Sequence, residues 1–317
     1  EPDVADLEDI YLFSIDDLQQ VVAENKQQRA SEADAAHGLI TQEVARFLSE
    51  VQSWGPDLVL QMHGSGDLSN PLALLLGGGT TVGFYRPGQF CPDPDRFIPY
   101  PDDLPEIDRH LRLLEHIGIP AMGRHKELPV FEADRRELAA LCATVGLERP
   151  YAVIHPGASV PERQWPPERF AAVADWLIGQ EFQVVLTGGP AETGIVHAVS
   201  ERMERRCISL AGRTRLGTLA ALLTDAALLV SNDTGVMHVG EAVGTPLVAV
   251  SFDPEAWRWA PLDTTRHRVL RGGLAVSVAD VLEAVQEGLG DCTAAHRAES
   301  SPAGQMSDGA WGASERR

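Results

Sequence analysis

The feature that most constrains this chain is the regular alternation of apolar runs and amphipathic runs between residues 151 and 252. The apolar runs are YAVI, FQVVLTG, CISLAG, ALLVS and LVAVSF. Strands that are almost continuously apolar are typical of a parallel sheet covered by helices on both faces. The helices expected between them are 167–178, 191–203, 216–223 and 235–243. This alternation predicts βαβ units and an α/β fold with a parallel sheet.

A second, less regular series precedes it. Its expected strands are 7–13, 57–62 and 82–85, and its expected helices are 42–54, 71–76, 106–117 and 132–145. Val44, Phe47 and Val51 share one face of the first of these helices, at the spacing of an amphipathic helix. Six prolines between residues 86 and 105 predict a rigid surface loop.

The chain length favours two domains, because 317 residues correspond to roughly two domains of about 150 residues each. We expect an N-terminal α/β domain at 1–149 and a C-terminal α/β domain at 150–289. Residues 290–317 are rich in Ala, Ser, Gly and Glu without a period, and they are expected to form a disordered tail.

Charge and cysteine content exclude several classes of protein. The formal net charge is −20, which argues against nucleic-acid binding through a basic surface, although a local phosphate site is still compatible with it. The four cysteines lie far apart, without the spacing of a zinc site, so a reducing cytoplasm is expected. The sequence has no apolar run of the roughly 18 residues that a membrane span needs.

The most informative candidate site is the loop Asn232-Asp233-Thr234-Gly235, followed by His238. It directly follows a predicted strand and opens a helix, and ligands of open parallel sheets bind at such strand ends. The helix N-terminus would favour a phosphate, and Asp233 would bind sugar hydroxyls. The alternative is that Asp233 or Thr234 only caps the helix.

Two further charged residues follow neighbouring strands. Arg163, in the loop that also contains Ser159, could neutralise a diphosphate, or it could be a solvated loop charge. Glu192, at the next strand-to-helix turn, suits the hydroxyls of a ribose, or it could be a first-turn glutamate favoured by the helix dipole.

Four other patterns bear on chemical function, and each has a simpler explanation or lacks the required spacing. The run GGGTTVG at 77–83 lacks the spacing of a dinucleotide fingerprint, and there is no P-loop motif. Asp93-Pro94-Asp95 resembles a metal-binding D-x-D, but its proline-rich loop favours a surface turn. His63 follows a first-domain strand and is a candidate for the acceptor side, with a structural loop histidine as the alternative.

Seven loop motifs occur in a characteristic order along the chain. They are QMHGSG (61–66), GFYRPG (83–88), HPGA (155–158), RQWPPERF (163–170), LTGG (186–189), LAGRT (210–214) and NDTGVMH (232–238). In this order they resemble glycosyltransferase family 9, the ADP-heptose:lipopolysaccharide heptosyltransferase family, and the resemblance covers about residues 4–289.

The resemblance implies a GT-B fold of two Rossmann-like domains, with the nucleotide sugar on the second and the acceptor on the first. It implies inverting, metal-independent glycosyl transfer without a cofactor. The expected donor is a nucleoside-diphosphate sugar, with ADP-heptose as the leading candidate, and the expected acceptor is a glycan or glycolipid of lipopolysaccharide biosynthesis. The expected location is the cytoplasm, in contact with the inner face of the cell membrane. The residues expected to bind the donor are Ser159, Arg163, Glu192, Asp233, Thr234, Gly235 and His238.

One departure from the family concerns the general base. Family members begin with a strand and an S-x-G-D loop that carries this base, and the motif is absent here, where the chain begins at Glu1. We therefore expect an incomplete first domain, through truncation or true loss, and His63 and Asp67 are the candidates to replace the base. A nucleotide-sugar-binding remnant and a GT-B nucleotide-sugar 2-epimerase are the alternative functions.

Overall fold

The structure is a computed structural model that describes residues 36–53 and 55–299, with side chains described up to residue 289. The strand expected at 7–13 lies outside the described residues. The chain divides into two compact units: a first unit of Glu1–Asp103 and Arg109–Ala121, and a second unit of Leu104–Asp108 and Met122–Arg317. The domain boundary expected between residues 149 and 150 stays a prediction.

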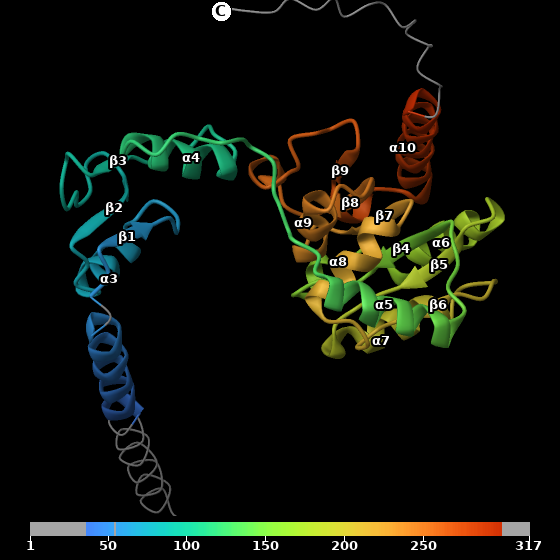
Figure 1. Cartoon of the computed structure of the whole chain (residues 1–317), viewed down its shortest axis with the longest axis horizontal. Helices are drawn as coiled ribbons and strands as arrows, with labels where there is room; N and C mark the ends of the chain where they lie inside the picture. The colour runs from blue at the N-terminus through green and yellow to red at the C-terminus, as the bar shows by residue number, and fades with distance from the viewer. Residues whose placement is uncertain (1–35, 54, 300–317) are drawn as a thin grey trace, which may run out of the picture. The chain divides into compact units, whose positions relative to one another are not determined.

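The described part of the first unit is built around a small parallel sheet of order β1-β2-β3 (Figure 1). Residues 36–53 are helical, and the sheet follows them. The elements are β1 (Leu58–Gln61), α3 (Ser69–Leu75), β2 (Thr80–Tyr85), β3 (Phe97–Pro99) and α4 (Glu106–His116), whose first residues belong to the second unit. Strand β3 lies within the proline-rich stretch expected to be a loop. Pro99 pairs with Tyr85 at the end of an edge strand of the described sheet, where a missing N–H is tolerated.

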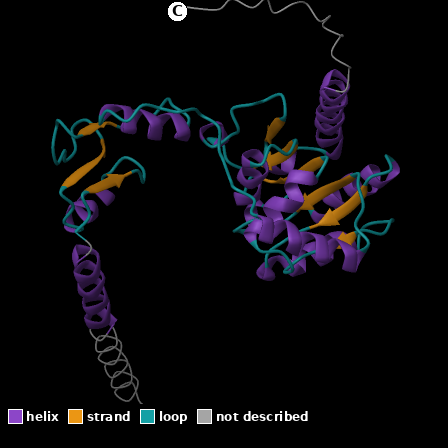
Figure 2. Ribbon diagram, in the orientation of Figure 1, coloured by secondary structure: helices purple, strands orange, loops and turns teal. Residues whose placement is uncertain are grey.

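The second unit is a doubly wound parallel sheet of order β6-β5-β4-β7-β8-β9. Its strands are β4 (Tyr151–His155), β5 (Gln183–Leu186), β6 (Ile208–Ser209), β7 (Leu228–Asn232), β8 (Leu247–Ser251) and β9 (His267–Arg271). Its helices are α5 (Glu132–Val145), α6 (Pro167–Gly179), α7 (Thr193–Ser200), α8 (Leu216–Asp225), α9 (Gly235–Ala242) and α10 (Val278–Glu299). Figure 2 shows these helices on both sides of the strands, so the predicted α/β class with parallel sheets is confirmed.

Two differences from the sequence prediction concern the C-terminal part. Strand β9, HRVLR, extends the sheet beyond the last expected strand. It was not predicted because its two arginines interrupt the continuous apolar run that is typical of a buried parallel strand. Helix α10 continues to Glu299, into the stretch expected to be a disordered tail, where Ala294, Ala295 and Ala298 favour a helix.

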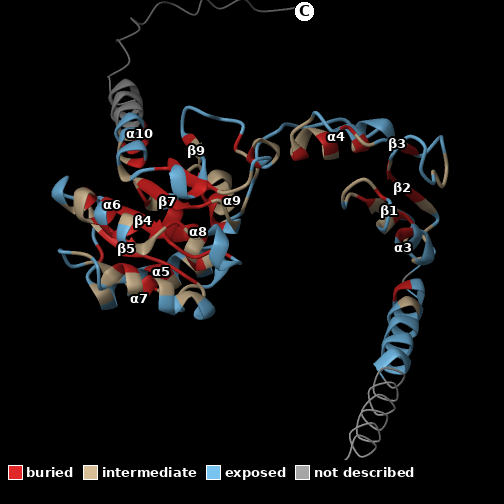
Figure 3. Cartoon of the chain, turned by 180° about the vertical axis from the view of Figure 1, so that it is seen from behind, coloured by how far each residue is buried: buried red, intermediate tan, exposed pale blue. Residues whose placement is uncertain are grey.

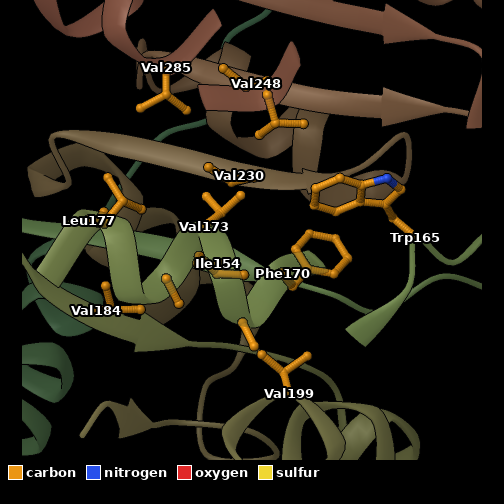
Figure 4. Packing of buried hydrophobic residues seen from close by; sticks show 14 of the residues in the cluster. Ile154, Trp165, Phe170, Val173, Leu177, Val184, Val199, Val230, Val248 and Val285 are labelled. Carbon is orange, nitrogen blue, oxygen red and sulfur yellow. The ribbon is translucent and has the colours of Figure 1, made fainter. Parts of the chain in front are cut away.

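The core of the second unit occupies both faces of its sheet. On one face, Trp165, Phe170 and Val173 pack around α6, and the Trp165 and Phe170 rings meet edge to face with centroids 5.1 Å apart (Figure 4). On the other face, α5 and α8 pack together and contribute Leu138 and Leu222 to the core. Helix α5 ends where Gly146 adopts a φ of +69°, a left-handed conformation that favours glycine.

Strand order reverses between β4 and β7. From β4 the chain continues outward to β5 and β6, whereas β7, β8 and β9 extend the sheet in the other direction. The loops that leave β4 and β7 therefore diverge at a crevice, and this switch point is where doubly wound sheets bind their ligands.

Candidate functional site: the strand-end pocket of the second unit

A pocket of about 620 Å³ lies at the carboxyl ends of β4, β5, β7 and β8. All seven residues predicted to bind the donor line it: Ser159, Arg163, Glu192, Asp233, Thr234, Gly235 and His238. The structure thus brings together residues that are up to 79 positions apart in the sequence (238 − 159). That they bind a nucleotide sugar stays a prediction.

Asn232 joins the two loops at the switch point. Its side chain is fully buried, and its Nδ2 donates to the carbonyls of Pro156 at 2.8 Å and Gly157 at 3.2 Å. Its Oδ1 accepts the N–H of Trp165 at 2.9 Å. One amide at the end of β7 thus fixes both ends of the loop that carries Ser159 and Arg163.

The start of α9 presents backbone N–H groups that the helix itself does not use. Thr234 is the N-cap residue, and its side chain makes no capping hydrogen bond. Asp233 also does not cap the helix, since its Oδ2 accepts the Ser251 hydroxyl at 2.6 Å. The Thr234 Oγ1 is buried without a partner among the described residues. The structure therefore does not support the alternative that Asp233 and Thr234 serve only as helix caps. Because no side chain caps the helix, the N–H groups of Gly235 and Val236 face outward from its N-terminus.

The packing around position 235 does not explain why this residue is a glycine. A Cβ built there meets no atom within 4 Å, and φ is not in the left-handed region. The open space beside this glycine is where a ligand can approach the helix N-terminus closely.

Glu192 is held in place at the second loop. Its Oε2 accepts the N–H of Gly189 at 2.7 Å and lies 3.4 Å from Nε2 of His155. The pKa of the Glu192 carboxyl is lowered, first by the His155 side chain and then by the Gly189 N–H, against the opposing effect of burial. A Cβ on Gly157 would lie 2.1 Å from this carboxylate, so glycine at that position makes room for it. Glu192 therefore enters the pocket as a fixed carboxylate.

Arg163 also lines the pocket, and its side chain is half exposed. Its guanidinium lies 3.8 Å from Asp253, a residue that follows β8. The Asp253 carboxylate is oriented by the N–H of Glu255, which donates to its Oδ1 at 2.8 Å, and the Asp253 N–H donates to Oγ of Ser251 at 3.2 Å. The pair is loose and solvated, so Arg163 is available to an incoming anion.

His238 takes part in a charged cluster one turn into α9. Lys126 Nζ lies 3.0 Å from Nδ1 of His238 and 2.6 Å from Oε2 of Glu241. Burial acts to raise the pKa of Glu241, but the neighbouring His238 and Lys126 side chains outweigh it and leave the pKa below its ordinary value.

The candidate bases His63 and Asp67 belong to the first unit. Both side chains are exposed, and Asp67 accepts the Ser65 hydroxyl at 2.9 Å.

The D-x-D pattern of the sequence lies in a turn of the first unit. The Asp93 carboxylate accepts the N–H of Asp95 at 2.9 Å, as in a surface turn. No cluster of three or more His, Cys, Asp or Glu side chains that could hold a metal occurs among the described residues. The absence of a metal requirement and the identity of the base stay predictions.

Three further lining residues, His155, Ala158 and Val236, lie in the loop motifs of the sequence but were not among the predicted donor-binding residues. No site role was predicted for Leu216, Leu219, Val239, Asp253 and Trp259, nor for Lys126 and Glu241, which contact His238. Asp253 follows a strand, so the strand-end rule would have found it. Lys126 lies in a loop without periodicity, and no local signal marks it.

No helix among the described residues has the length and apolar character needed to cross a membrane.

Comparisons with known proteins agree with this architecture. The chain is 32% identical over 201 residues to lipopolysaccharide heptosyltransferase 2 of Escherichia coli, which covers 59% of this chain and 58% of the relative. The chain spans about half the length of the curated relatives it matches.

Solved structures show the same fold. A glycosyltransferase family 9 structure from Veillonella parvula has a TM-score of 0.64 at 24% identity and covers 78% of this chain and 77% of its own. The structure of E. coli heptosyltransferase WaaC with ADP-2-deoxy-2-fluoro heptose has a TM-score of 0.56 at 19% identity, covering 78% and 77%. The fold is therefore of the GT-B type.

The model of glycosyltransferase family 9 (heptosyltransferase) matches residues 44–273, well over half of the chain. This chain therefore belongs to glycosyltransferase family 9.

Proposed function

We propose that the second unit binds a nucleoside-diphosphate sugar, with ADP-heptose as the donor, for transfer to a saccharide or glycolipid acceptor of lipopolysaccharide synthesis. The observation that carries the proposal is the convergence of the start of α9, Arg163 and Glu192 on one pocket. Membership of family 9 supports the class of reaction. The WaaC structure with an ADP-heptose analogue supports the donor.

Each group has a role that follows from its chemistry. The outward N–H groups at Gly235 and the guanidinium of Arg163 bind the diphosphate. Glu192, ionised and fixed, accepts hydrogen bonds from ribose hydroxyls. Asp233, oriented by Ser251, does the same for hydroxyls of the sugar. Ser159 lines the same pocket, on the loop held by Asn232 that also carries Arg163.

The proposed reaction is a single displacement with inversion and without a metal. The acceptor hydroxyl oxygen attacks the anomeric carbon, the bond from that carbon to the diphosphate oxygen breaks, and a base takes the hydroxyl proton. The helix N-terminus and Arg163 stabilise the negative charge that develops on the leaving diphosphate. His63 and Asp67 remain the proposed candidates for the base.

The test is titration calorimetry of the chain with ADP, beside the Arg163→Ala variant. Loss of one charge-assisted contact should weaken ADP binding by about 1.5–3 kcal/mol. Unchanged affinity in Arg163→Ala would remove this residue from the site, and no heat with the wild-type chain would contradict the proposal.

A transfer assay with ADP-heptose, in the presence and absence of EDTA, tests the reaction. Transfer that EDTA leaves unchanged supports metal independence. Loss of transfer with EDTA that magnesium or manganese restores would contradict it. Nucleotide binding without transfer would favour a binding protein over an enzyme.

A further inference from the structure

Lys126 contacts His238, a lining residue of the pocket, from a segment outside the strand-end loops. It lies in the irregular segment between α4 and α5, and its ammonium sits between two residues of α9, His238 and Glu241. The side chain of Lys126 is 31% exposed, and that of Glu241 is 11% exposed. Lys126 is one of two lysines in a chain that otherwise uses arginine for its basic side chains.

The hydrogen bonds of this cluster determine which ring nitrogen of His238 carries the proton. A lysine ammonium has three donors and no acceptor. Lys126 donates to the ionised Glu241 at 2.6 Å and lies 3.0 Å from Nδ1 of His238. The Glu241 carboxylate lies 3.6 Å from the same nitrogen, too far to accept a hydrogen bond from it. The geometry therefore favours an Nδ1 that accepts from Lys126. The proton of the neutral imidazole then lies on Nε2.

We propose that Lys126 is a positioning residue that holds His238 in the Nε2–H form, so that the ring donates a hydrogen bond to the diphosphate of the donor. His238 lines the pocket one turn after Gly235, so a donor on its ring adds to the backbone N–H groups at the start of the helix. The hydrogen bond to the diphosphate rests on the proposed function, whereas the control of the His238 tautomer by Lys126 does not depend on it.

The charge balance of the pocket shows why such a donor matters. Glu192, Asp233 and Asp253 line the pocket as carboxylates, and Arg163 is the guanidinium among its lining residues. A diphosphate entering this site needs donors placed away from these carboxylates. An imidazole with the opposite tautomer would instead present a lone pair on Nε2, which repels phosphate oxygens.

A purely structural role for Lys126, tying its segment to α9, would leave the tautomer free. The variants Lys126→Met and Lys126→Arg separate the two roles, because a guanidinium also only donates. Arg124→Met is the matched control, since Arg124 lies on the same segment and pairs with Asp108 rather than with α9.

The direct experiment is long-range ¹H–¹⁵N NMR of the histidine rings of the full chain without nucleotide, with His238 assigned by His238→Gln. The wild-type chain and Arg124→Met should show the Nε2–H form, Lys126→Met a mixture of tautomers, and Lys126→Arg the Nε2–H form again. An Nδ1–H or doubly protonated ring in the wild-type chain, which needs no variant to fold, would overturn the proposal. So would an unchanged Nε2–H form in Lys126→Met.

Calorimetry with ADP on the same samples tests the link to binding. Lys126→Met should bind ADP roughly fivefold more weakly, as expected for one neutral hydrogen bond, with Lys126→Arg restored. Equal affinity in Lys126→Met and the wild-type chain would overturn the link to the diphosphate. An Nε2–H ring in a wild-type chain that binds no ADP would contradict the proposed function and leave the positioning role intact.

Discussion

The two compact units of this chain differ in how completely they bury their own apolar side chains. In the second unit, both faces of a six-stranded sheet are covered, and residues such as Trp165 and Phe170 have no exposed surface. In the described part of the first unit, a three-stranded sheet and α4 bury only a small cluster of Val82, Phe84 and Leu113. Figure 3 shows the contrast, with buried strands in the second unit and a largely exposed helix at residues 36–53.

The helix at residues 36–53 illustrates the difference in burial between the two units. Its sequence predicts an apolar face, yet Phe47 is 56% exposed and Val44 is 49% exposed, whereas Val51 near its end is buried. Among the described residues, nothing packs against the exposed part of this face. Amphipathic pattern decides which side of a helix can be buried, and only neighbouring elements decide whether it is.

The largest expected effect compares two aromatic side chains of similar chemistry. Trp165→Ala should destabilise the second unit by about 3–5 kcal/mol, because it opens a cavity in a full core. Phe47→Ala should change the stability of the first unit by about 0.5 kcal/mol or less, because this side chain is exposed. Urea unfolding measures both. A comparable loss in Phe47→Ala would show that residues outside the described ones cover this face.

A smaller difference is expected for two buried asparagines. Asn232→Ala leaves the Trp165 N–H and two carbonyls without their partner and should cost about 2–3 kcal/mol. Asn70, the matched residue of the first unit, donates one bond to the Phe84 carbonyl at 2.8 Å, so Asn70→Ala should cost about 1 kcal/mol. The same urea experiment checks this order.

Asn232→Ala should also weaken ADP binding, because it releases the loop that carries Arg163. Asn70→Ala should leave the affinity unchanged. Equal stability losses in the two variants, or intact ADP binding in Asn232→Ala, would contradict the role given to Asn232.

The smallest expected effect is the pH dependence of Glu192. Because the folded pKa of its carboxyl is lowered, its contribution to stability is complete above the ordinary glutamate pKa and is lost as the pH falls through the folded value. The difference in melting temperature between the wild-type chain and Glu192→Gln should therefore be constant near neutral pH and shrink in the acid range. A difference that stays constant down to the most acid pH tested would show that the ionised carboxylate contributes nothing.

The second unit was the more predictable half. Continuous apolar strands and helical spacing are local signals that predict where each strand ends. Because parallel sheets bind ligands at the carboxyl ends of their strands, these predicted ends also locate the candidate site. All seven predicted residues consequently line one pocket. The helix predicted at 132–145 coincides with α5, since Gly146 marks its end in the sequence.

What escaped prediction depends on contacts between distant residues. Strand β9 pairs with β8, although its own sequence, HRVLR, is neither continuously apolar nor alternating. The role of Asn232 depends on carbonyls 75 and 76 positions away. Lys126 reaches α9 across more than a hundred residues of sequence. Periodicity within a short window contains no information on such pairs.

The central claim is that the second unit holds a complete nucleotide site of its own. Differential scanning calorimetry of the full chain, with and without ADP, tests it most directly. We predict two transitions, of which the lower one comes from the first unit, and a rise with ADP in the melting temperature of the upper transition alone. An upper transition that ADP leaves unchanged, or a lower transition that ADP raises, would contradict the claim.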